Sequence, residues 1–98
     1  MVIKITVKRI TEYKDLMEEY ENPIEHTCDM YVGKTFILNE CKKPHDMCPS
    51  AWETLYPFIN DLFNGKNNFF DGWMKNKDSA MISCNDGFRP VSFYIEVI

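Results

Sequence analysis

The sequence predicts an α+β fold in one domain over residues 1–98: a mostly antiparallel sheet of about four strands, a long helix packed across one face, and a short second helix. Two strand patterns near the C-terminus are joined by a turn, and another begins the chain. Between them, a long stretch repeats apolar residues at helical spacing. The order β-α-β-α-β-β is typical of an antiparallel sheet that carries its helices on one side.

The first elements are a strand and a short helix. Apolar and polar residues alternate in MVIKITVKRI, which predicts a half-buried strand over residues 2–9. Apolar side chains then recur three and four positions apart, so we expect an amphipathic helix over residues 12–20, capped by Thr11. They are Tyr13, Leu16, Met17 and Tyr20. Residues 21–32 show no period and contain Pro23, which predicts a loop.

The middle of the chain predicts a second strand and the long helix. Residues 35–39 place apolar side chains on one face of a strand. Pro49 is favoured at the first position of a helix, which makes Cys48 the N-cap, and Asn64 with Gly65 supplies the stop. The apolar stripe of this helix is Trp52, Leu55, Tyr56, Ile59, Leu62 and Phe63. Such a stripe predicts packing against the sheet.

Two strands, over residues 80–84 and 91–97, are predicted to close the chain, because Asp86 and Gly87 between them are a strong turn signal. If the two ends of the chain pair, the last strand lies between the first and the third. Its β-branched and aromatic residues suit such a central place.

Residues 66–78, KNNFFDGWMKNKD, combine turn-forming and aromatic residues. They predict either an ordered loop folded over the edge of the core or an exposed binding patch. Aromatic and Arg side chains dominate protein interfaces, so a patch that contacts a partner is one alternative, and packing is the other. The candidate partner-contact residues are Phe69, Phe70, Trp73, Phe88 and Arg89.

Composition excludes several classes of protein. The formal net charge of −4 gives no basic footprint for nucleic acid. The apolar runs are too short to cross a bilayer, and the first residues alternate where a signal peptide would be continuously apolar. We therefore expect a cytoplasmic protein that binds neither nucleic acid nor membrane, and whose partner is another protein.

The chain contains four cysteines: Cys28, Cys41, Cys48 and Cys84. They could form two disulfides, but without a secretion signal we favour reduced thiols. At a helix N-terminus, backbone N–H groups and the helix dipole favour a thiolate at Cys48, and hence nucleophilicity or metal ligation. Cysteine is also a common core residue, so simple space filling stays open for each of them.

Several segments occur together in this chain: KITV, a loop cysteine before a Gly-x-x-Phe strand, a cysteine shortly before Trp and a helix, and ISCNDGFRPVSFYIEVI. With these segments the whole chain resembles a family of short, functionally uncharacterised proteins of anaerobic bacteria and archaea. The resemblance implies a recurrent cysteine trio that matches Cys28, Cys48 and Cys84, and it implies no activity. Cys41 lies outside that pattern, and Asp29 stands where many relatives have proline.

Metal ligation by these cysteines would need ligands from separate segments, because no C-x₂-C pair occurs. His26 with Cys28, and His45 with Cys48, are close pairs that could each give two ligands. Cys84 or Cys41 would complete a zinc or iron–sulfur site. Exposed loop histidines are the alternative.

The sequence thus predicts a small accessory protein with a cysteine site that binds or handles a metal, either zinc or an iron–sulfur cluster. Two hypotheses stay open beside it: a partner-binding module without chemistry, and a thiol-redox protein that uses Cys48. The common enzyme motifs are absent, although Cys48 with His45 or His26 could form a nucleophilic pair.

Overall fold

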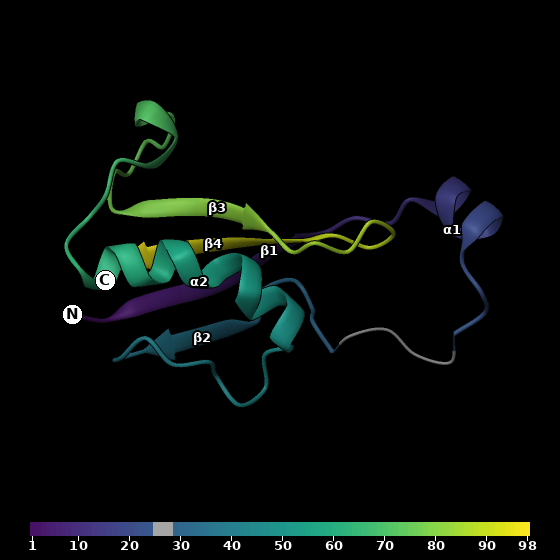
Figure 1. Ribbon diagram of the computed structural model, residues 1–98, viewed down its shortest axis with the longest axis horizontal. Helices are drawn as coiled ribbons and strands as arrows, with labels where there is room; N and C mark the ends of the chain where they lie inside the picture. The colour runs from purple at the N-terminus through teal and green to yellow at the C-terminus, as the bar shows by residue number, and fades with distance from the viewer. Residues whose placement is uncertain (25–28) are drawn as a thin grey trace.

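The computed structural model describes residues 1–24 and 29–98 and confirms the α+β fold (Figure 1). Four strands form one antiparallel sheet in the order β2-β1-β4-β3. The strands are β1 (Ile3–Ile10), β2 (Thr35–Leu38), β3 (Ser79–Ser83) and β4 (Val91–Val97). The helices are α1 (Lys14–Tyr20), α2 (Pro49–Phe63) and the short 3₁₀ turn η1 (Phe69–Gly72). As predicted, the last strand lies between the first and the third.

The core lies between the sheet and α2, which crosses one face of the sheet in Figure 1. Alternate residues of every strand are buried on this side, which is the period-two pattern read from the sequence. The helix contributes a stripe of buried side chains: Ala51, Leu55, Ile59 and Leu62. Burying one such leucine or isoleucine stabilises the fold by roughly 1.5–3 kcal/mol. The helix continues through Pro57, and Ile59 and Leu62 are buried beyond it.

The opposite face of the sheet, here called the open face, is covered by no helix of the described residues. Cross-strand neighbours on it include Thr6, Tyr94 and Met81, which lie side by side on β1, β4 and β3. The register of β1 against β4 shifts between Val7 and Arg9, which is the mark of a β-bulge. The open face therefore ends in an irregular, strongly twisted corner.

The helix α1 stands away from the sheet, at one end of the long axis of the molecule (Figure 1). None of its residues is buried. The principal extents are 43 × 29 × 20 Å and the radius of gyration is 14.4 Å, against about 13 Å for a compact chain of this length. The molecule is elongated because of this arm.

The predicted start of α1 was wrong: its N-cap is Tyr13, without a side-chain cap, and not Thr11. The cause is pairing with a distant part of the chain. The Thr11 N–H donates to the Pro90 carbonyl (3.0 Å) and the Tyr13 N–H to the Phe88 carbonyl (2.9 Å). Thr11 therefore continues the strand ladder, and the helix begins only at Lys14.

No helix in the described part of the chain is long and apolar enough to cross a lipid bilayer.

Candidate functional site

Cys48 is the N-cap of α2, as the sequence predicts. Its backbone is extended (φ −68°, ψ 146°), Pro49 follows at the first helical position, and its Sγ accepts the N–H of Ala51 at 3.3 Å. The sulfur therefore satisfies one of the helix N–H groups that would otherwise lack a partner. Cys48 is half-buried and packs against the core, so its side chain stabilises the fold through packing and capping, independently of any chemistry of the thiol.

His45 and Cys48 line one open pocket of about 290 Å³ just before α2. The lining residues are Asp29, Met30, His45, Asp46, Met47 and Cys48. The Asp46 carboxylate also forms an ion pair with the Lys34 ammonium, at 3.5 Å. The first lining residue in the sequence, Asp29, directly follows Cys28. Cys28 and His26 themselves lie outside the described residues. Over residues 1–24 and 29–98, no three His, Cys, Asp or Glu side chains are grouped to hold a metal ion.

Cys84 closes the hairpin between β3 and β4. Its Sγ accepts the N–H of Val91 at 3.2 Å, and its own N–H donates to the Val91 carbonyl at 2.9 Å. The next residue, Asn85, accepts a hydrogen bond of 2.5 Å from Ser50 on the first turn of α2. This bond ties the last hairpin to the start of the helix that Cys48 caps.

Cys41 follows β2 and packs against the core. Burial raises the pKa of its thiol, since a low-dielectric surrounding disfavours the thiolate. A neutral thiol is a poor ligand and a slow nucleophile. All three cysteines that the structure describes are free thiols.

The aromatic loop after α2 is partly folded onto the core and partly exposed. Phe69 is half-buried and packs edge-on against Phe58 of α2, with ring centroids 5.3 Å apart; Phe70 lies 5.7 Å from the same ring. Trp73, four residues after Phe69, is 85% exposed. The loop is therefore packed on the core at Phe69 and exposed at Trp73, and binding by its exposed part stays a prediction.

Backbone geometry in this loop is unusual. Asn68, Phe70 and Asp71 have φ values of 59°, 58° and 53°, in the left-handed region. For Phe70 this costs roughly 1–2 kcal/mol, because its Cβ approaches the following carbonyl oxygen. Hydrogen bonds across the loop hold it in place, from the Asn68 N–H to the Lys77 carbonyl (2.8 Å) and from Asn67 Nδ2 to Asp78 Oδ1 (2.8 Å).

The β3–β4 connection, which contains Phe88 and Arg89, lies at the other end of β3 from the aromatic loop (Figure 1). The Arg89 guanidinium donates to both carboxylate oxygens of Glu21, at 2.9 and 2.8 Å. This hydrogen-bonded pair raises the pKa of Arg89 further above its ordinary value. Arg89 therefore ties the end of the α1 arm to the β3–β4 turn, and the five predicted partner contacts do not form one patch.

Sequence reasoning missed that the apolar stripe of α1 has no core to join. Tyr13 is 43% exposed, Leu16 38% and Tyr20 70%. It also missed a hollow of about 410 Å³ on the open face, lined by Lys8, Arg9, Met81 and Ser92. The signal that could have found the hollow is the breakdown of alternation at Lys8 and Arg9, where two consecutive basic residues end the first strand.

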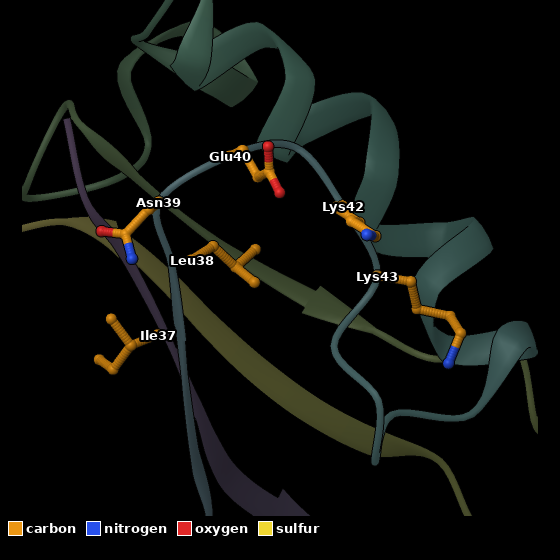
Figure 2. Close-up of a pocket in the computed structure, with 6 residues that line it drawn as sticks. All are labelled: Ile37, Leu38, Asn39, Glu40, Lys42 and Lys43. Carbon is orange, nitrogen blue, oxygen red and sulfur yellow. The ribbon is translucent and has the colours of Figure 1, made fainter.

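A further pocket, of about 340 Å³, lies where β2 runs into the connector to α2 (Figure 2). Ile37 and Leu38 extend from opposite sides of the strand in this view. The Lys43 ammonium donates to the Met47 carbonyl at 2.6 Å and to the Pro44 carbonyl at 3.0 Å. Lys43 therefore holds the connector together, and we assign this pocket no chemistry.

Comparison of the chain with protein-family models, with curated proteins and with solved structures found no match. The family expected from the sequence resemblance stays a prediction.

Proposed function

We propose that this protein is a cytoplasmic accessory module that binds another protein, with the Trp73 side chain as its central contact. The observation that carries the proposal is the 85% exposure of Trp73 on a loop that its own hydrogen bonds hold in place. Tryptophan is the residue most enriched at the energetic centres of protein interfaces.

The loop suits this task because it is ordered before any partner arrives. Phe69 anchors it on α2, and the bond between Asn67 and Asp78 closes its base. A partner would then bury the indole without ordering the backbone, which is a main cost of binding by flexible loops. Unusual backbone conformations often occur where a protein binds something, since the fold must compensate for their cost.

Site-specific photocrosslinking in the host cell tests the proposal. The photoreactive residue p-benzoylphenylalanine replaces Trp73 in one variant and Tyr56, an exposed aromatic residue of α2, in the matched control. We expect one discrete adduct from position 73 that the control does not give. The purified partner, once identified, should bind Trp73→Ala about 30-fold or more weakly, which is the loss of a typical interface centre of 2 kcal/mol. No adduct from position 73, or the same adducts from both positions, would contradict the proposal.

Metal binding is a second candidate, favoured by the pocket that His45 and Cys48 share and that also includes Asp29, the residue after Cys28 in the sequence. Imidazole nitrogen and thiolate sulfur are ligands that zinc prefers, and thiolates also hold iron–sulfur clusters. Elemental analysis and an absorption spectrum of protein purified without oxygen test it. We expect a stoichiometric metal that is lost in a Cys48→Ala variant. Protein that carries no metal and binds no added zinc tightly would exclude it.

A further inference from the structure

We infer that two copies of this chain form a symmetric dimer in which α1 of each copy docks on the open face of the other copy's sheet. The inference is independent of the Trp73 proposal, because it uses other elements. It accounts for two surfaces that the described residues leave uncovered: the apolar stripe of α1 and the hollow on the open face.

The helix α1 and its N-cap residue carry an apolar stripe that the described residues cover only in part. Its members are Tyr13, Leu16, Met17 and Tyr20, which recur on one side of the helix. A short helix that buries no apolar face is marginal in water, since most helical stability in proteins comes from packing. A partner surface for this stripe would therefore stabilise the helix itself.

The arm cannot reach the open face of its own sheet. Its first residues pair with the β3–β4 turn through the bond from the Tyr13 N–H to the Phe88 carbonyl. Its end is fixed to the same turn by the two bonds between Arg89 and Glu21. These contacts hold α1 beyond the end of the sheet, as Figure 1 shows, and present it outward.

The open face offers a matching surface. The hollow between β1, β4 and β3 is lined by Lys8, Arg9, Met81 and Ser92. Met81 and Ile37 are large apolar side chains exposed on β3 and β2, the two edge strands. A helix laid on this face beside β3 would cover the Met81 side chain and meet basic groups at the bulged corner of β1.

Charge decides which surfaces pair. Residues 12–21, EYKDLMEEYE, carry five acidic side chains and one basic one. Two such arms packed on each other would bring like charges together, which costs free energy. The hollow on the open face carries Lys8 and Arg9, so an arm docked there meets opposite charge. Arm on sheet is therefore favoured over arm on arm.

Two-fold symmetry doubles the interface. A seven-residue helix is about 10 Å long, so a single contact would be small beside the roughly 1,200–2,000 Å² of a stable interface. In a two-fold dimer the arm-on-sheet contact forms twice, and the interface closes on itself without growing into a filament.

Sedimentation equilibrium on the whole chain tests the inference with two variants. The arm variant, Leu16→Asp, places a charge in the apolar stripe of α1. The face variant, Lys8→Glu/Arg9→Glu, reverses the charge of the hollow on the open face. We expect the parent to be a dimer and each variant alone to be a monomer, whereas the matched control Lys66→Glu, an exposed charge beyond α2, stays dimeric. Circular dichroism and urea unfolding establish that each variant is folded.

Charge reversal gives the sharpest result, because it rebuilds both contacts with the opposite signs. Reversing the arm charges as well, with Glu18→Lys/Glu19→Lys in the face variant, should restore its homodimer. A monomeric parent, a face variant that charge reversal leaves monomeric, or a dimer that Leu16→Asp breaks while Lys8→Glu/Arg9→Glu leaves it intact would each overturn the inference.

Discussion

Replacing Cys48 by serine and by alanine separates its role as a helix cap from a role as a metal ligand. The Cys48 Sγ accepts the N–H of Ala51 at 3.3 Å, and the side chain is half-buried against the core. Serine keeps a cap acceptor in the same place and is a strongly preferred N-cap residue, whereas alanine leaves that N–H without a partner. Loss of an N-cap side chain costs about 0.5–2 kcal/mol.

We therefore expect Cys48→Ser to unfold within about 0.5 kcal/mol of the parent, because the better acceptor offsets the lost packing of sulfur. Cys48→Ala should be about 1 kcal/mol less stable than Cys48→Ser. With a urea dependence of about 1–2 kcal/mol per molar for a chain of this size, the two midpoints should differ by roughly 0.5–1 M.

The assay is urea unfolding followed by tryptophan fluorescence, with and without a metal chelator. If Cys48 acts only as a helix cap, the difference in unfolding free energy between the serine and alanine variants is the same with and without chelator. If Cys48 is a metal ligand, both variants are equally less stable than the metal-loaded parent. The chelator then removes this loss, since metal-binding energy is folding energy. Equal losses for serine and alanine that disappear with chelator would refute the capping argument.

Three further outcomes follow from the contacts. Leu55→Ala should cost roughly 2–5 kcal/mol in urea unfolding, because the fully buried side chain leaves a cavity between α2 and the sheet. Burial raises the pKa of Cys41, so its alkylation near neutral pH should be slower than that of Cys48. The alkylation rate of Cys41 should also still rise at pH values where the rate of an ordinary thiol no longer changes. Equal rates for the two cysteines would contradict the burial argument. Arg89→Gln removes the charge partner of Glu21, and hydrogen exchange should accelerate in α1 while the sheet keeps its protection; unchanged exchange in α1 would show that the arm is held by other contacts.

Most of the fold could be predicted because its signals are local. Alternation in the strands, the cap at Cys48 and the stop at Asn64 each depend on a few consecutive residues, and the structure has the long helix from Pro49 to Phe63 with Asn64 as its C-cap. The start of α1 could not be predicted in this way. Thr11 is a good capping residue, but hydrogen bonding to Pro90, far along the chain, takes precedence over its local preference.

The site was harder to predict because it depends on which distant segments meet. Phe88 and Arg89 were grouped with the aromatic loop by residue type, whereas β3 separates them from it. Arg89 is paired with Glu21, 68 positions earlier in the chain. No local pattern marks such a pair. The zinc or iron–sulfur hypothesis stays a prediction, since His26 and Cys28 lie outside the described residues.

The sequence by itself determined the strands, the long helix and most of the face that each buries, because periodicity follows directly from the geometry of one strand or one helix. Tyr56, which was expected in the buried stripe of α2, is 44% exposed. Only the tertiary structure decided what those faces meet. It set α2 on one side of the sheet and left the other side open among the described residues, and it placed the apolar stripe of α1 beyond the core. The reason is that an amphipathic pattern indicates only that one face of an element needs burial. Chain connectivity and long-range hydrogen bonds decide whether another part of the same domain can cover that face.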